Sequence, residues 1–345
     1  MQQGYATADG TARYARRYPQ FNDFFNQPQD LNVSSLGIGS YLGAVDEETS
    51  RSYEEAMIVA LQNGINFIDT SLNYRNQQSE RNIGAALERL LPSGKIARDE
   101  FMISTKAGYL IAGAVTSKVV EKEDVVGDGH AMCPRFLNDQ LDRSRNNLGL
   151  ATIDIFYLHN PETQLDELGE DEFYTRLEAA FSTLEEAVSD GKIRFYGAAT
   201  WNGFRQSENA LSLRRMEQVA QSIAGELHKF RFIQLPFNLA MPEALQLRDQ
   251  DNRSVLDHAV DLDISVVASA SILQSRLAHD LPQTLKGRLE GLDTDAQRAI
   301  QFTRSTPGID VALVGMSKAA HVSENLGVAK VPPVELADYL RLFHQ

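Results

Sequence analysis

The chain has 345 residues, which is enough to bury a large core, and it carries 33 basic against 47 acidic side chains. The resulting formal net charge of −14 disfavours nucleic acid and anionic membrane surfaces as partners. The one cysteine, Cys133, excludes an internal disulfide framework and a cysteine-rich metal site, and no metal site is predicted. Apolar runs stay well short of the roughly 20 residues that a membrane-spanning helix needs. The N-terminus has no secretory pattern, so we expect a cytoplasmic protein.

Along the chain, a polar leader over residues 1–31 precedes short β-rich runs that alternate with longer helix-period segments. The sequence predicts eight strands, at 34–41, 66–69, 101–106, 153–159, 193–200, 232–237, 264–270 and 311–315. It predicts helices between and after them, at 49–63, 79–91, 135–148, 172–190, 207–228, 252–262, 318–327 and, more weakly, 282–304. A helical tail is expected at 332–345.

A strand followed by a helix, repeated eightfold without a Pro/Gly linker, predicts a single (β/α)₈ barrel over residues 32–345. The alternative is a doubly wound open sheet, which would carry G-x-G-x-x-G between its first strand and helix. The near match "LGIGSYLG" lies inside the first strand, so the barrel is favoured. Residues 108–134 exceed what a strand-to-helix connection requires. They predict a lid or pocket wall on the active-site side, with a disordered surface loop as the alternative.

Ionisable side chains end three consecutive predicted strands. Asp69 follows "NFI", Lys106 is the last residue of "ISTK", and His159 is the last residue of "FYLH". Taken singly, the acid could cap a turn, the lysine could reach solvent and the histidine could bond to backbone. Because neighbouring strands lie roughly 4.8 Å apart and barrel chemistry sits at the carboxyl ends of the strands, we expect the three to converge on one site.

Tyr74 lies five residues beyond Asp69, within reach of the same site. An ion pair between Asp69 and Lys106 would place a cation beside the phenol, which predicts a Tyr74 pKa below its usual value of about 10. Tyr74 could then give a proton to a carbonyl oxygen while His159 orients that oxygen. This is equipment for carbonyl reduction, and the hydride must come from a cofactor.

With these motifs, "FIDTSLNY", "ISTKAGY" and "YLHNP", the chain resembles the aldo-keto reductase family, within its bacterial branch of aryl-alcohol-dehydrogenase-like and sugar-oxidoreductase-like enzymes. The resemblance runs from about Leu36 to Leu326. It implies a barrel with a catalytic tetrad of Asp69, Tyr74, Lys106 and His159. It also implies NADPH, or less often NADH, bound across the C-terminal face without a separate dinucleotide-binding domain.

The resemblance assigns cofactor contacts along the same face. The segments after the first, fifth and sixth strands would hold the nicotinamide end, and those after the seventh and eighth would hold the pyrophosphate and adenosine. A family Ser-Asn pair is replaced here by Ala199 and Thr200, and no aromatic residue follows the seventh strand. The implied contacts are Gly39, Ser40, Tyr41, Asp69, Thr200, Gln234, Ser269, Ile272, Gln274, Arg276, Ser317, Lys318, His321, Glu324 and Asn325. Only Arg276 and Lys318 suit a 2′-phosphate, so NADP(H) is favoured by the resemblance and NAD(H) stays open.

The substrate is expected to be a small-molecule carbonyl compound or a sugar. Aromatic and amide side chains near the strand ends would meet it, namely Tyr41, Tyr109, Asn160, Trp201 and Phe237. Two other functions stay open from the sequence. One is a cofactor-binding regulatory subunit without turnover, and the other is a redox-neutral lyase or epimerase that uses the same tetrad. The sequence leaves the oligomeric state undetermined.

Overall fold

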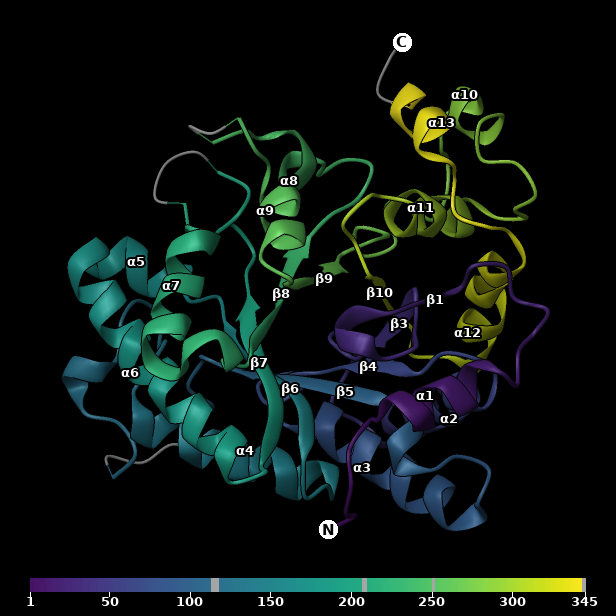
Figure 1. Ribbon diagram of the computed structural model, residues 1–345. Helices are drawn as coiled ribbons and strands as arrows, with labels where there is room; N and C mark the ends of the chain where they lie inside the picture. Colours follow the sequence, from purple (N-terminus) through teal and green to yellow (C-terminus); the bar gives the residue numbers. More distant parts are fainter. Residues whose placement is uncertain (113–117, 207–209, 250–251, 343–345) are drawn as a thin grey trace.

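The computed structural model describes residues 1–112, 118–206, 210–249 and 252–342 (Figure 1). Eight parallel strands close into a barrel in the order β10, β3, β4, β5, β6, β7, β8, β9. Their bounds are β3 Leu36–Gly39, β4 Phe67–Asp69, β5 Met102–Ala107, β6 Ile153–His159, β7 Ile193–Ala199, β8 Phe230–Pro236, β9 Ser265–Ser269 and β10 Val311–Gly315. The predicted eight-stranded barrel is confirmed.

Helices surround this barrel (Figure 1). The longer ones are α2 Glu47–Gln62, α3 Gln78–Leu90, α4 Pro134–Leu148, α6 Glu170–Ser189, α7 Leu213–Ala224, α9 Val255–Asp261, α11 Asp295–Arg304 and α12 Ala319–Asn325. The sequence did not predict α5 Glu162–Leu168 or α8 Glu243–Gln246, and the weak pattern at 282–304 divides into α10 Gln283–Lys286 and α11. In the tail, α13 spans Leu336–Arg341. None of the helices in the described ranges is long and apolar enough to cross a bilayer.

Local sequence signals explain where several of these helices begin and end. The Asp46 side chain accepts a hydrogen bond from the Thr49 N–H and caps α2, and Ser254 caps α9 in the same way through the Asp257 N–H. Helix α4 starts at a proline and stops at Gly149, whose φ of 68° is the left-handed conformation that glycine adopts without strain.

The segment before the barrel lies at the N-terminal ends of the strands. It contains α1 (Ala8–Ala15) and a two-stranded antiparallel hairpin of β1 (Phe25–Asn26) and β2 (Val33–Ser34). The Ala6 N–H donates to Asp154 Oδ1 at 2.8 Å near the start of β6, and the Asn26 side chain donates to the Asp310 carbonyl at 2.6 Å just before β10. The chemistry expected at the opposite ends of the strands is therefore left open to solvent.

Two apolar layers hold the barrel together. One fills its interior and includes Phe67, Met102, Ile155, Phe232 and Val311. The larger layer lies between the strands and the surrounding helices. Because successive strand residues point to opposite faces, strands buried on both faces read as the continuous apolar runs seen in the sequence.

The long connection between β5 and α4 is described except for residues 113–117, so part of the predicted 108–134 insertion lies outside the described residues. Its two arms pair: the Leu110 N–H donates to the Gly129 carbonyl and the Ala131 N–H to the Gly108 carbonyl, both at 2.8 Å. Arg176 of α6 donates to the Glu123 carbonyl at 2.9 Å. These contacts attach residues 118–134 to the rest of the molecule.

Candidate active site

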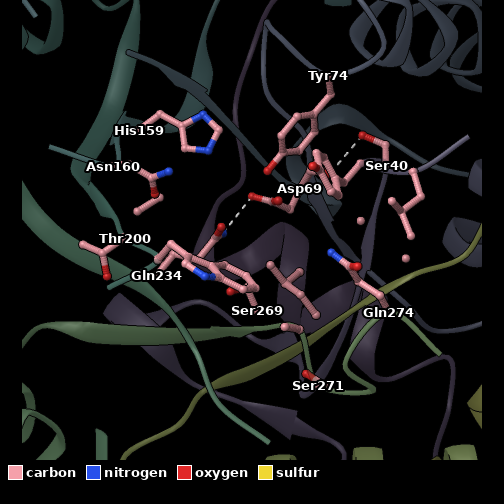
Figure 2. Close-up of a pocket in the computed structure, with 18 of the residues that line it drawn as sticks. Ser40, Asp69, Tyr74, His159, Asn160, Thr200, Gln234, Ser269, Ser271 and Gln274 are labelled. Carbon is pink, nitrogen blue, oxygen red and sulfur yellow. Dashed lines mark hydrogen bonds between the residues drawn. The ribbon is translucent and has the colours of Figure 1, made fainter. Parts of the chain in front are cut away.

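A cavity of about 440 Å³ opens at the C-terminal ends of the strands (Figure 2). Its lining comes from β3, β4, β6, β7, β8, β9 and β10, and from loops that follow the strands, including the loop after β5. Of the predicted site residues, it brings together Gly39, Ser40, Tyr41, Asp69, Tyr74, Tyr109, His159, Asn160, Thr200, Trp201, Gln234, Ser269, Ile272 and Gln274.

A buried ion pair lies on the β4 and β5 side of the cavity. Lys106 Nζ is 2.6 Å from Asp69 Oδ2 and also donates to the Thr70 carbonyl at 2.8 Å. The other Asp69 oxygen accepts from Ser104 Oγ at 2.7 Å and from Gln234 Nε2 at 2.9 Å. Lys106 is fully buried, and burial lowers its pKa although the Asp69 charge opposes that shift.

The Tyr74 hydroxyl is 3.5 Å from Lys106 Nζ, and Figure 2 shows it directed toward Asp69 in the cavity. The expectation of a lowered pKa for Tyr74 is wrong. Burial raises the Tyr74 pKa well above its usual value, and the Asp69 carboxylate raises it further. The physical reason is first that a buried phenolate would lose its solvation, and second that Asp69, 2.6 Å from Lys106 Nζ, already neutralises the charge that would stabilise it. Tyr74 is therefore a neutral phenol, which is a proton donor.

His159 lies across from Tyr74, with ring centroids 5.8 Å apart. Its pKa is held well below the usual value, chiefly by burial and then by the nearby charge of Lys106 and by His130. The ring is consequently a neutral imidazole at neutral pH. Its backbone carbonyl accepts a hydrogen bond from His130 Nε2 at 2.8 Å. The next residue, Asn160, donates from its side chain to the Tyr109 hydroxyl at 2.7 Å.

The residues that the resemblance assigns to the nicotinamide differ in their hydrogen bonding. Some of their side chains already have partners within the protein, and one does not. The Ser40 hydroxyl donates to Thr70 Oγ1 at 2.9 Å, and Gln234 donates to Asp69. Thr200 is 4 % exposed, and its hydroxyl has no hydrogen-bond partner among the described residues. Thr200 lines the cavity, but this unpartnered oxygen is itself buried.

The adenosine-end residues lie outside the cavity, on the loops after β9 and β10 and in helix α12. Arg276, Lys318, His321 and Glu324 are exposed, and neither cation forms an ion pair with a described residue. Asn325 is buried in α12, and Ser317 accepts through its carbonyl from Ser52 Oγ at 2.6 Å.

Phe237 does not line the cavity, which corrects its expected substrate contact. It is fully buried and stacks on Phe302 of α11 with ring centroids 5.8 Å apart. Phe237 continues the alternation of Ile233 and Leu235, which face the helices, so its ring joins the layer between strands and helices. Tyr41 and Trp201 remain partly exposed at the rim, at 55 % and 41 %.

Several residues that contact this site were missed by the sequence analysis. Ser71 and Asn73 follow β4, and Ser104 points inward from β5 to Asp69. Glu162 accepts at one oxygen from the N–H groups of Trp201 and Asn202, at 2.7 and 3.0 Å. An inward-facing serine beside Asp69 was detectable from strand alternation, whereas the other contacts join segments far apart in sequence.

The chain belongs to the aldo/keto reductase family, because the model of that family matches residues 35–284. The fold agrees with solved structures. An aldo/keto reductase from Klebsiella pneumoniae in complex with NADP and acetate has a TM-score of 0.64 at 19% identity, with 93% of this chain and 95% of that chain covered. An aldo-keto reductase from Bacillus halodurans, in its holo form, has a TM-score of 0.65 at 17% identity, with 94% and 95% covered.

Curated relatives are similar over part of the chain. A D-threo-aldose 1-dehydrogenase from Pseudomonas sp is 27% identical over 48% of each chain. An NADH-specific methylglyoxal reductase from Escherichia coli is 26% identical over 49% of each chain. An L-glyceraldehyde 3-phosphate reductase from the same species is 29% identical over 57% of this chain and 51% of that protein. The chain thus spans about half the length of the curated relatives it matches.

Proposed function

We propose that the protein is an NAD(P)-dependent oxidoreductase that reduces an aldehyde, ketone or sugar carbonyl, or oxidises the corresponding alcohol. The observation that carries this proposal is the position of the Tyr74 hydroxyl, 3.5 Å from Lys106 and across from His159 in one cavity. Family membership supports the reaction class. The four residues Asp69, Tyr74, Lys106 and His159 form the proposed catalytic set.

The residues at the cavity floor fit a nicotinamide. A primary carboxamide needs a donor and an acceptor. The Thr200 hydroxyl is buried and unpartnered, and a change of its rotamer would turn it toward the carboxamide. The Gln234 amide, which donates to Asp69, keeps its oxygen to accept. When bound there, the nicotinamide supplies the hydride that no side chain can supply.

NADP(H) is the favoured form, and NAD(H) is the alternative. Arg276 and Lys318 are exposed cations without a carboxylate partner among the described residues, so both suit a 2′-phosphate. A solved relative contains NADP, while one curated relative is named as NADH-specific. We therefore propose that Arg276 and Lys318 determine whether the protein prefers NADP(H) or NAD(H).

In the proposed reaction Tyr74 donates its proton to the carbonyl oxygen as that oxygen gains negative charge. The raised pKa of Tyr74 keeps the phenol protonated at neutral pH, which suits reduction. For alcohol oxidation the phenolate must accept the proton, so that direction should speed up as pH rises. His159, a neutral imidazole, donates a hydrogen bond that orients the oxygen.

The substrate class is a small carbonyl compound or an aldose. The rim offers the exposed rings of Tyr41 and Trp201, which can pack on the apolar face of a sugar or an aryl group. Asn73 and Asn160 add amide groups that can bond to hydroxyls. The names of the curated relatives concern an aldose, methylglyoxal and glyceraldehyde 3-phosphate, all small carbonyl compounds.

The test is a panel of aldehydes, ketones and aldoses with NADPH and NADH, monitored by nicotinamide absorbance, on wild type and Tyr74→Phe. The expected result is turnover by wild type, a loss of about a hundredfold or more in Tyr74→Phe, and unchanged cofactor affinity by fluorescence titration. Full activity in Tyr74→Phe would contradict the role of the tyrosine. Product formation without a change in nicotinamide absorbance would instead indicate a redox-neutral reaction.

A further inference from the structure

We infer that Arg75 is a positioning residue that holds the loop after β3 against Tyr74, the proposed proton donor. The inference rests on the proposed function, in which Tyr74 must meet the carbonyl oxygen of the substrate. The observation behind it is a buried guanidinium on the residue directly after Tyr74. Arg75 is 7 % exposed, and it donates hydrogen bonds to the Ala44 carbonyl and to the Asn82 side chain.

The backbone at Arg75 has an unusual conformation. Its φ is 47°, and the next two residues, Asn76 and Gln77, have φ angles of 52° and 70°. This left-handed region is disfavoured for residues that carry a β-carbon, so they persist there where the surrounding structure holds them. Residues 75–77 connect Tyr74 to the start of α3. We therefore expect the contacts of the Arg75 side chain to fix the course of the chain directly after the phenol.

The Arg75 guanidinium joins three parts of the molecule. Its Nε and Nη2 atoms both donate to the Ala44 carbonyl, at 3.0 and 2.8 Å, in the loop after β3. Its Nη1 atom donates to Asn82 Oδ1 of α3 at 3.0 Å, and Nη2 also donates to Ser50 Oγ of α2 at 3.3 Å. The Asn82 amide nitrogen donates to Glu54 Oε1 at 3.2 Å, so its oxygen is the atom that faces Arg75. One side chain thus attaches the loop after β3 to both helices.

None of these hydrogen-bond acceptors is a carboxylate. Two carboxylates of α2 pair with other arginines, Glu47 with Arg51 and Glu54 with Arg89. A carboxylate partner would balance the buried charge of Arg75, whereas carbonyl, amide and hydroxyl acceptors use the fixed planar shape of its guanidinium. These contacts therefore fix geometry.

A second connection to the same loop runs through Tyr53 of α2. The Arg75 guanidinium carbon lies over the Tyr53 ring, 4.9 Å from its centroid, and the Tyr53 hydroxyl donates to the Leu42 carbonyl. The loop is thus held at two backbone carbonyls, those of Leu42 and Ala44. Tyr41 and Leu42 of this loop line the cavity, so the contacts of Arg75 reach the wall of the site.

Tyr41 forms one side of the space around the Tyr74 phenol. The two rings pack edge-on, with centroids 4.9 Å apart. On other sides, Lys106 Nζ lies 5.0 Å from the centroid of the Tyr74 ring, and the His159 ring lies 5.8 Å from it. Tyr41 is largely exposed, so its position depends on the backbone that Arg75 holds. Because a small displacement of a reacting group lowers a rate strongly, loss of the Arg75 contacts should slow proton transfer.

The first test is Arg75→Asn, because asparagine tolerates a positive φ better than most residues and is too short to reach Ala44. In ¹⁵N relaxation NMR, the order parameters of the backbone amides at 42–46 should fall from values typical of rigid backbone toward those of flexible loops. The kcat for carbonyl reduction should fall about tenfold. Arg89→Met removes the exposed partner of Glu54, and as the matched control it should change neither quantity.

A double variant separates positioning from a general loss of structure. If Arg75 acts through Tyr41, Arg75→Asn should lower kcat by less than about twofold in protein that already carries Tyr41→Ala. A purely structural role of Arg75 would give effects on kcat that multiply.

Tyr53→Phe provides a second single variant for the case in which Arg75→Asn does not fold. It removes only the hydroxyl that bonds to the Leu42 carbonyl, so it should loosen 42–46 and lower kcat about threefold. A wild-type kcat in Arg75→Asn, effects that multiply with those of Tyr41→Ala, or wild-type order parameters in Tyr53→Phe would each overturn the inference. The NMR result does not require turnover. A wild-type protein that reduces no carbonyl compound would instead overturn the proposed function.

Discussion

The two ends of the barrel each hold a buried ion pair, and the pairs differ in what surrounds them. At the N-terminal end, Arg98 is 2.7 Å from Asp154, whose oxygens also accept from the N–H groups of Ala6 and Ile103. At the C-terminal end, Lys106 is 2.6 Å from Asp69. The first pair is enclosed by backbone, whereas Asp69 lines the cavity and Lys106 reaches toward the Tyr74 hydroxyl.

The comparison shows that neither the burial of an ion pair nor the distance between its charged atoms tells whether the pair serves folding or catalysis. Both pairs are almost inaccessible, and both are short. What separates them is the third neighbour: backbone groups of the chain for Arg98, and a phenol beside a cavity for Lys106. We therefore expect one pair to matter for folding and the other for turnover.

The largest effect is expected at the enclosed pair. Arg98→Met should lower the free energy of unfolding by about 3–5 kcal/mol, because it leaves the Asp154 carboxylate buried without its counter-ion. Chemical denaturation measures this loss. The kcat of the remaining folded protein should stay near the wild-type value. Arg51→Met, which removes an exposed partner of Glu47, is the matched control and should lose far less stability. Equal losses of stability in Arg98→Met and Arg51→Met would contradict the expected importance of the enclosed pair for folding.

The next effect is expected at the pair beside the cavity. Lys106→Met should reduce kcat by about a hundredfold to a thousandfold, because the cation that borders the Tyr74 hydroxyl is lost. Its loss of stability should be smaller than that of Arg98→Met, because Asp69 lines the cavity, where water can solvate its charge, whereas Asp154 is fully buried. Steady-state kinetics and denaturation on the same preparation measure both quantities. A variant that unfolds as readily as Arg98→Met yet keeps its kcat would show that this pair is structural too.

The smallest effect is expected at an unpartnered hydroxyl. Thr200→Val keeps the side-chain shape and removes the oxygen proposed to bind the carboxamide, so Kd for the nicotinamide should rise about threefold to tenfold. Stability should stay the same or increase, because no internal hydrogen bond is lost. Thr183→Val is the control, because its hydroxyl bonds to the Ala179 carbonyl. Thr183→Val should lower the free energy of unfolding and leave the Kd for the nicotinamide unchanged. If Thr200→Val instead lowers stability without raising Kd, the contact to the carboxamide lies elsewhere.

The sequence was a good guide to the barrel because parallel strands buried on both faces leave largely apolar runs. The run at 153–159, for example, lies between the polar residues Thr152 and Asn160. The strand ends followed directly, so the residues Asp69, Lys106 and His159 could be placed at one rim. The positions of these residues along the chain were enough to place them at one rim, because no contact between distant segments was needed for that prediction.

Electrostatics and long-range contacts were beyond the sequence. The pKa of Tyr74 was predicted in the wrong direction, because its sign depends on how completely Asp69 neutralises Lys106 and on burial, which are distances and exposures. Phe237 was misplaced although strand alternation could have indicated its side, because it continues the helix-facing series of Ile233 and Leu235 and packs on Phe302. The contact between Ser71 and His159 joins residues 88 positions apart, and no local pattern marks it.

Glu162 has a consequence for engineering this protein. One of its two carboxylate oxygens accepts from the N–H groups of Trp201, Asn202 and Gly203, and so it fastens the loop after β7 to the start of α5. Directed evolution of substrate range would naturally begin with this loop, since Trp201 stands at the rim. Libraries that vary side chains at 201 and 202 but keep the glutamate would preserve the loop's anchor. Exchanging the loop for one of another length would release it, and Thr200 with it.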